Sequence, residues 1–374
     1  MRFGLPSLAH PHGLAQVQSL NVVIDNPALV LFGTNFARAG PVPVGLTGRR
    51  ISVTSFGVMN ESLTVLSAVI PVFGIIALGL VIRKLDWLTE EADQSLIRVN
   101  INVLFPCLIL DAALGNAALA QAGNLVLAPL VGFVTAAVGM LLGRAARPLH
   151  GLRDPAAART FSATVGIYNY SYIPLPLALL LFPGSETVGV LFLHNVGVEI
   201  AMWTFGVMLF RGTRLGRDWR NVINAPLLAI VAALALNWFG WHDAVPRSVR
   251  LGVHWLGQCA IPMALVLIGA VVADHLKDFH STPGWRTILS AVLLRQAVLP
   301  VLFLLAARHL PATLELKRVM VLEAAMPSAV FPIVMARHYG GDPPTALRVV
   351  IGTSVVSLVT IPLWIRVGAA WVGL

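Results

Sequence analysis

Charged side chains are scarce in this chain of 374 residues. Asp, Glu, Lys and Arg together make up 11% of it, whereas a soluble domain usually carries about 25%. Hydrophobic residues make up 57% of the chain, and its mean hydropathy is +0.80. This shortfall of charge over the whole length excludes an ordinary soluble core and predicts an all-α polytopic membrane protein.

Cysteine is also scarce, and catalytic motifs are missing. The two cysteines, Cys107 and Cys259, both fall inside apolar segments, which argues against a disulfide framework or a cysteine metal site. The sequence has no HExxH or GxSxG motif and no close group of His, Asp and Cys. We therefore expect no enzyme, no cofactor and no resident metal, and leave only H⁺ or Na⁺ open as a coupling ion.

Residues 1–58 lack the sustained apolar runs of the rest of the chain. They are rich in Gly and Pro and do not show the pattern of a signal peptide. Met59 leads directly into the apolar stretch NESLTVLSAVIPVFGIIALGLVIRK. We expect residues 1–58 to be a disordered leader or the product of a mis-assigned start. The remainder divides into a first half, 59–212, and a second half, 213–374.

Ten apolar segments have the length of about 20 residues that a membrane-spanning helix needs. They lie near residues 62–82, 92–114, 121–143, 158–182, 187–210, 222–240, 249–273, 286–307, 317–338 and 346–372. Lys and Arg are concentrated in alternate loops, such as RGTRLGRDWR at 211–220. By the positive-inside rule these loops face the cytoplasm, which places both termini on the non-cytoplasmic side of the cell membrane. The bias accounts for the net charge of +9 without a nucleic-acid partner.

The two halves carry matching irregularities. YNYSYIPLP at 168–176 interrupts the fourth segment, and AAMPSAVFP at 324–332 interrupts the ninth. In the second and seventh segments an amide, Asn102 or Gln258, stands four residues before a proline. A proline inside a helix costs about 3 kcal/mol and frees a carbonyl. Paired interruptions of this kind indicate a five-plus-five inverted repeat and mark the binding site of a transporter.

The stretches MPSAVFPIVMARHYGGDP at 326–343 and GTSVVSLVTIPLW at 352–364 resemble the auxin efflux carrier family. The resemblance extends over about residues 60 to 374 and covers PIN-type auxin exporters and bacterial malonate and malate carriers. It implies ten helices arranged as in bile-acid and Na⁺/H⁺ transporters, with broken helices 4 and 9 crossing beside the substrate. Helices 1, 2, 6 and 7 would form a scaffold that mediates a homodimer, and the others would move. Asn169 and Pro176 fit the family motif, whereas Ser171 and Pro174 stand where the family usually has glycine.

The candidate substrate-binding residues surround the two interruptions and the two amides. They are Asn169, Tyr170, Ser171, Pro174, Pro176, Pro327, Ser328, Asn102 and Gln258. A carboxylate at such a break can bind to free N–H groups at a half-helix N-terminus, with Asn169 donating its amide or acting only as a cap. In an extended segment, Tyr168, Tyr170 and Tyr172 would form one wall. Asn102 and Gln258 could instead bond only to neighbouring helices.

Ionisable residues inside apolar helices are costly and often functional. Glu323 is the first candidate for a coupling carboxylate, unless it forms an ion pair with Arg295, and Glu199 and His194 follow. The sequence therefore predicts a secondary active transporter of an organic anion, a small carboxylate, working by alternating access. A non-transporting membrane sensor or a subunit of a larger assembly is the alternative.

Overall fold

The computed structural model describes residues 54–182, 184, 186–213, 217–280 and 284–374. Apart from one isolated β-bridge, every regular element in this part is a helix, which confirms the all-α prediction. The prediction about residues 1–58 falls outside it, except that α1 already begins at Thr54.

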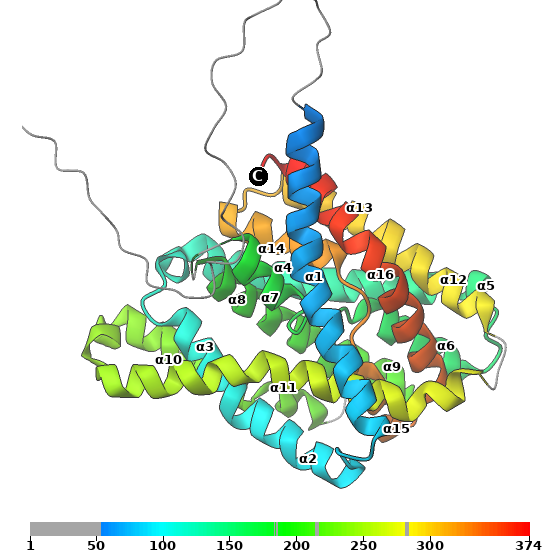
Figure 1. Cartoon of the computed structure of the whole chain (residues 1–374). Coiled ribbons are helices and arrows are strands. Elements are labelled where there is room, and N and C mark those ends of the chain that lie inside the picture. Colours follow the sequence, from blue (N-terminus) through cyan, green and yellow to red (C-terminus); the bar gives the residue numbers. More distant parts are fainter. Residues whose placement is uncertain (1–53, 183, 185, 214–216, 281–283) are drawn as a thin grey trace, which may run out of the picture. The chain divides into compact units, whose positions relative to one another are not determined.

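One group of helices packs around the long helix α11 (Figure 1). The group consists of α1 (Thr54–Lys84), α2 (Glu90–Val99), α3 (Phe105–Ala113), α10 (Ala225–Trp238) and α11 (Arg247–His280). Helix α11 packs on α1 and α3, and α10 packs on α3. At one end of this group, Arg83 of α1 is buried and pairs with Asp93 of α2 and, at 3.0 Å, with Asp274 of α11.

The second group contains the remaining long helices. Its members are α4 (Ala122–Ala145), α6 (Pro155–Gly166), α7 (Pro174–Leu181), α8 (Glu186–Ala201), α9 (Val207–Arg211), α12 (Trp285–Leu293), α13 (Leu299–His309), α14 (Leu314–Ala325), α15 (Phe331–Tyr339) and α16 (Pro343–Val372). Helix α4 packs on α6 and α8, and α14 packs on α8, α13 and α16. The short helix α5 (Arg147–His150) lies between α4 and α6 in the chain.

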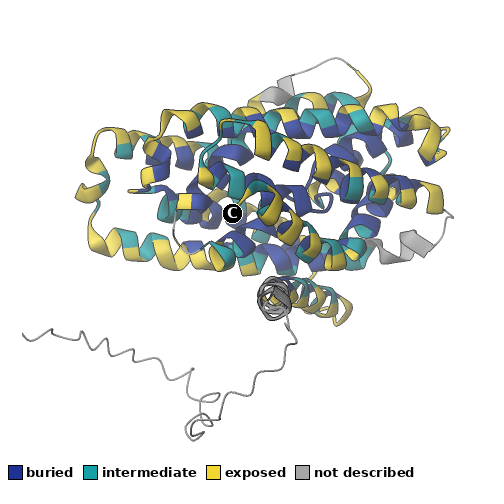
Figure 2. Ribbon diagram, turned by 90° about the horizontal axis from the view of Figure 1, so that it is seen from above, coloured by how far each residue is buried: buried dark blue, intermediate teal, exposed yellow. Residues whose placement is uncertain are grey.

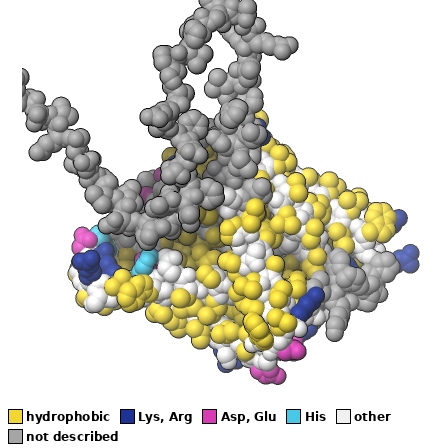
Figure 3. All heavy atoms as spheres, viewed as in Figure 1, with side chains coloured by type: hydrophobic (Ala, Val, Ile, Leu, Met, Phe, Trp, Pro, Cys, Tyr) yellow, Lys and Arg dark blue, Asp and Glu magenta, His cyan; other side chains and the backbone are white. Residues whose placement is uncertain are grey.

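The described surface has the character of a membrane protein. Buried residues run through the middle of the helix layers and exposed ones lie outside (Figure 2). Hydrophobic side chains cover much of the described surface in Figure 3, whereas charged ones gather at its margins. Large exposed apolar residues such as Val126, Val231 and Val359 occur along the helices. Such residues are stable on a surface that faces lipid.

Six helices in the described part are long and apolar enough to cross a membrane. They are Glu90–Ala113, Ala122–Ala145, Glu186–Arg211, Arg247–Asp274, Trp285–His309 and Pro343–Val372. The other predicted segments correspond to α1, to the shorter apolar α10, and to the pairs α6–α7 and α14–α15. The chain is thus a multi-pass membrane protein, and the number of ten crossings stays a prediction.

Two non-helical segments lie beside each other in the second group. The first joins Gly166 of α6 to Pro174 of α7, and the second joins Ala325 of α14 to Phe331 of α15. Tyr168 and Ser328 form an antiparallel bridge, with hydrogen bonds from Asn169 N to Pro327 O at 2.8 Å and from Ala329 N to Ile167 O at 2.9 Å. The interrupted backbones satisfy each other here, as a membrane interior demands. We call this paired region, residues 167–173 and 326–330, the crossing.

Proline begins the helix that follows the first interruption. Pro174 stands in the first turn of α7, where its fixed φ suits a helix start and its missing N–H is not needed. Pro332 takes the equivalent place in α15. These prolines therefore start helices at the crossing and do not merely kink continuous ones.

Three π-helical segments occur in the described part of the chain: Asn100–Leu104, Met202–Gly206 and Leu294–Val298. Each extra residue rotates the following side chains relative to a regular α-helix, and such bulges are frequent at functional sites. All three segments contribute residues to the regions described below.

Helices α4 and α8 approach closely through glycine. A Cβ atom on Gly197 would lie 1.8 Å from Pro129 O, and one on Gly132 would lie 2.0 Å from His194 O. Small residues permit this backbone contact between membrane helices.

We expect Gly197→Ala to destabilise the protein by about 1–3 kcal/mol through overpacking, measured as a lowered Tm in detergent. Gly123→Ala on α4 is the control, because its Cβ meets nothing within 4 Å. Equal Tm values for both variants would contradict this packing.

Candidate substrate cavity

A cavity of about 320 Å³ lies between the two helix groups, beside the crossing. Its lining comes from α2, α3, α8, α10, α11 and α15, from two π-helical segments and from the crossing. Aromatic residues form much of the wall: Phe105, Tyr170, Tyr172, Phe192, Trp203 and Phe331. The polar lining includes Asn100, Asn169, Ser171, Asn195, Glu199 and Asn224. A mostly apolar cavity with a few polar groups is typical of a small-molecule site.

Asn169 has one of the two roles that its sequence position suggested, that of a cap, and it lines the cavity. Its backbone is fixed by the bond to Pro327 O, and its side chain is 4% exposed. The side-chain oxygen accepts the N–H groups of Tyr172 at 3.0 Å and Ile173 at 3.2 Å, so it caps the turn before α7. The side-chain nitrogen has no acceptor among the described residues and belongs to a cavity-lining side chain. Asn169 therefore caps a helix with one atom and has a donor left for a ligand.

The start of α7 does not offer the free N–H groups that the sequence suggested. Tyr172 and Ile173 donate to Asn169, Pro174 and Pro176 have no N–H, and Leu175 donates to Ser171 O at 3.1 Å. The prolines thus shape the crossing without donating to a ligand.

The start of α15 is different. Val330 and Phe331 line the cavity, and their N–H groups have no acceptor within the described ranges. Donors at this half-helix N-terminus are therefore free to meet an anion.

The expected wall of three tyrosines is wrong for Tyr168. Tyr170 and Tyr172 line the cavity, and Tyr172 packs edge-on against Phe105 at 5.5 Å between ring centroids. Tyr168 instead turns into the protein, where its hydroxyl lies 2.8 Å from Thr135 Oγ1 and 3.3 Å from His194 Nε2. Only one residue of this segment forms a bridge, and the chain turns at 171–173, so strand-like alternation does not extend across the three tyrosines.

Asn102 and Gln258 both lie outside the cavity lining. Asn102 is exposed and donates to Arg98 O at 2.8 Å, and it borders an adjoining depression of about 490 Å³. Gln258 is exposed on α11. Asn100 lines the cavity instead. The π-helical segment that begins at Asn100 changes the register, which the spacing to Pro106 could not reveal.

The coupling candidates divide between two places. Glu199 lines the cavity from α8, and its Oε2 accepts from Asn224 Nδ2 at 2.6 Å. Glu323 and His194 are buried, and neither of them lines the cavity. Both carboxylate oxygens of Glu323 and the Nδ1 of His194 lack a hydrogen-bond partner in the described part. The Ser328 hydroxyl is likewise buried there without a partner.

Arg295 holds this buried region together. The side chain is 0% exposed, and its Nε and Nη2 donate to Met326 O at 2.7 Å and Glu323 O at 2.8 Å. Its guanidinium lies 4.6 Å from the ring centroid of Tyr168 and 5.2 Å from that of Phe303. Arg295 thus binds the carbonyl groups at the end of α14, and does not form the carboxylate ion pair with Glu323 that the sequence left open.

Several lining residues were not anticipated. Asn100, Asn195 and Asn224 contribute amides, and Trp203 contributes a ring. The sequence signal for them was an amide inside or beside an apolar helix, which is costly in a membrane unless it is satisfied. None of these three asparagines is charged or stands four residues before a proline, so the features that mark the other candidates do not mark them.

The chain is similar in sequence to known membrane transport proteins. The family model described as "membrane transport protein" matches residues 64–221 and 217–365. An uncharacterized transporter of Methanothermobacter thermautotrophicus is 27% identical over 318 residues, which cover 82% of this chain and 98% of that protein. Auxin efflux carrier component 3 of Arabidopsis thaliana is 26% identical over 156 residues, which cover 40% of this chain and 24% of that protein. The chain therefore belongs to the membrane transport protein family, the family of the auxin efflux carriers.

Proposed function

We propose that this protein is a secondary active transporter that moves an organic anion, a small carboxylate, across the cell membrane by alternating access. The observation that carries the proposal is the cavity beside the crossing, lined by residues of both groups of helices. The α1–α3, α10 and α11 group would serve as scaffold. The group containing the crossing would move past it and expose the cavity to each side in turn.

The topology that this mechanism needs is part of the proposal. Ten crossings, arranged as two inverted sets of five, would place both termini on the non-cytoplasmic side. The paired non-helical segments at 167–173 and 326–330 support this symmetry, since each follows a helix of similar length and precedes a proline-started helix. A homodimer would form through the scaffold helices.

The carboxylate would bind at the crossing. Asn169 Nδ2 and the N–H groups of Val330 and Phe331 are donors without an acceptor among the described residues, and Ser171 also belongs to the lining. Backbone and amide donors at a helix N-terminus stabilise an anion without an arginine. The names of the plant relatives, auxin efflux carriers, agree with an organic acid as substrate.

Transport by purified protein in liposomes tests this function. Proteoliposomes loaded with unlabelled carboxylates would be tested for exchange against labelled acids of different sizes. We expect saturable exchange for at least one organic acid, absent from protein-free vesicles. Binding measured by thermal shift without any flux would instead favour the sensor alternative. Neither binding nor flux with any acid would contradict the proposal.

Glu323 is the group we expect to couple transport to protons. Its buried carboxylate lacks donors in the described part. Its backbone carbonyl accepts from Arg295, which also donates to the carbonyl of Met326 in the crossing. Glu323→Gln should abolish the stimulation of flux by an imposed pH gradient, because the amide, unlike the carboxyl group, does not take up and release a proton during transport. Glu315→Gln, on the same helix outside this region, should respond as the wild type does. An unaltered gradient response in Glu323→Gln would remove Glu323 from coupling and leave Glu199, His194 or Na⁺.

A further inference from the structure

The cavity has an unbalanced charge for a site that binds only an anion. Among the described residues that line it, Glu199 is the one carboxylate, and no Lys, Arg or His is present. Asn224 donates to one carboxylate oxygen of Glu199 through a neutral amide, and none of the described lining residues is a cation that could pair with this carboxylate. A ligand that carried only negative charge would be repelled by this group. The lining favours a ligand with a positive group of its own.

Two asparagine side-chain oxygens without donors also favour a ligand with a positive group. Asn100 and Asn195 line the cavity and are 2% and 5% exposed. Their side-chain oxygens have no hydrogen-bond donor in the described part. The nitrogen of Asn195 already donates to Ser171 Oγ at 3.1 Å, which orients the amide. Buried acceptors without donors are costly, and an ammonium group supplies three N–H donors.

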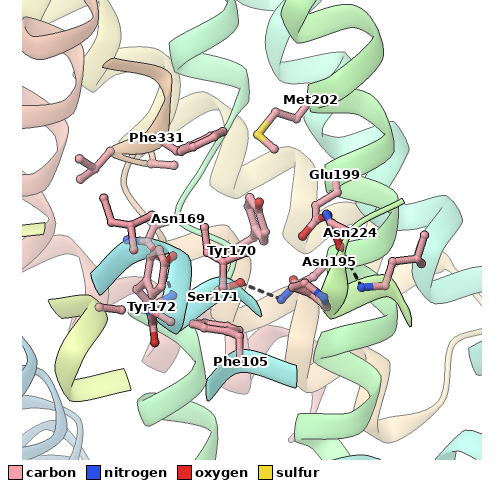
Figure 4. A pocket seen from close by; sticks show the side chains of 18 of the residues that line it. Phe105, Asn169, Tyr170, Ser171, Tyr172, Asn195, Glu199, Met202, Asn224 and Phe331 are labelled. Carbon is pink, nitrogen blue, oxygen red and sulfur yellow. Dashed lines mark hydrogen bonds between the residues drawn. The ribbon is translucent and has the colours of Figure 1, made fainter. Parts of the chain in front are cut away.

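The aromatic wall suits the same ligand. Figure 4 shows Glu199 and Asn224 on one side of the cavity, Asn169 and Tyr172 on the other, and Tyr170 between them. Aromatic faces attract ammonium groups and also pack against the apolar body of a ligand.

We propose that the substrate is an amphipathic zwitterion, with a carboxylate bound at the crossing and a protonated amine bound at Glu199. The donors Asn169 Nδ2 and the N–H groups of Val330 and Phe331 meet the carboxylate. Glu199 and the Asn100 and Asn195 oxygens meet the amine. This inference rests on the proposed transport function. It keeps the carboxylate of the proposed substrate and adds an ammonium group, so the substrate would be an amino acid or a similar molecule with an aromatic or apolar side chain.

Three probes with one indole ring separate the possibilities. Indole-3-propionate carries only the acid, tryptamine only the amine, and tryptophan both. Dissociation constants would be measured by equilibrium binding to the purified full chain in lipid nanodiscs. We expect tryptophan to bind at least about tenfold more tightly than either of the others, because each of them leaves buried polar groups unpaired.

Glu199→Gln should remove most of the difference in affinity between tryptophan and indole-3-propionate. Glu186→Gln, at the exposed start of the same helix, should preserve it.

Each contrary outcome has a distinct meaning. Binding of indole-3-propionate as tight as that of tryptophan would overturn the zwitterion while the organic-anion transporter stands. Preferred binding of tryptamine would overturn both assignments. If none of the three binds, the zwitterion is overturned, and exchange of short carboxylates in proteoliposomes then decides the proposed function alone. Equal thermal stability of Glu199→Gln and the wild type would show that the variant is folded.

Discussion

Replacing Asn169 with Asp is expected to weaken substrate binding by about 100-fold while the crossing stays folded. The Asp side chain keeps an oxygen that can cap the N–H groups of Tyr172 and Ile173, and Asp is as good a capping residue as Asn. It lacks the N–H donor and adds a negative charge beside the carboxylate site. Loss of a hydrogen bond to a charged group costs about 1.5–3 kcal/mol, and repulsion adds to it. Equilibrium binding and thermal unfolding of the same preparation would separate the two effects.

Asn169→Ala is the matched comparison. It removes both the cap and the donor, so we expect weak binding together with a loss of stability of about 1 kcal/mol. If both variants bind substrate with full affinity, Asn169 acts only as a cap, and the carboxylate site lies elsewhere in the cavity.

Replacing Arg295 with Met should produce the largest loss of stability, about 3–5 kcal/mol. The substitution removes the Arg295 donor from the Met326 carbonyl and leaves the Glu323 carbonyl only the N–H of Met326 at 3.3 Å. It also removes the ring contacts with Tyr168 and Phe303. It also leaves the Glu323 carboxylate without the attraction of the buried guanidinium. The loss would be measured as Tm in detergent and as the fraction of protein that elutes as a single species.

Two further variants test the cause of this loss. Adding Glu323→Gln to Arg295→Met should restore part of the stability, because neighbouring buried charges couple. Arg308→Met is the exposed control: its guanidinium lies over the ring of Trp371 at the surface, and its loss should cost little. A wild-type Tm for Arg295→Met would show that the guanidinium does not hold the end of α14.

The sequence predicted the parts of the fold that depend on local chemistry. Scarce charge and long apolar runs identify membrane helices, and the prolines of YNYSYIPLP and AAMPSAVFP mark the places where helices stop. Asn169 stands out because it fits the family motif and because its amide can cap an exposed N–H or donate to a carboxylate. These features depend on single residues and their immediate neighbours in the chain. They can therefore be predicted without knowledge of tertiary contacts.

Properties that depend on side-chain register could not be predicted. The π-helical segment at Asn100–Leu104 brings Asn100 into the cavity lining and leaves Asn102 outside it. The segment forms a bridge only at Tyr168, so that tyrosine turns into the protein, whereas Tyr170 and Tyr172 line the cavity. Neither feature has a marker in the local sequence. The contact of Arg295 with two carbonyls at the end of α14 is a tertiary interaction between residues about 30 positions apart.

Accessibility of the cavity from the two sides of the membrane tests the central claim most directly. The chain has only Cys107 and Cys259, so Val334→Cys, at an exposed cavity-lining position with no proposed ligand contact, can be introduced into a cysteine-free variant. A membrane-impermeant thiol reagent would be applied to proteoliposomes from outside or from inside, with and without substrate. Alternating access predicts that the reagent reaches position 334 from both sides, that substrate slows the reaction, and that modification stops flux. Labelling from one side only, with flux unaffected by modification, would contradict the account.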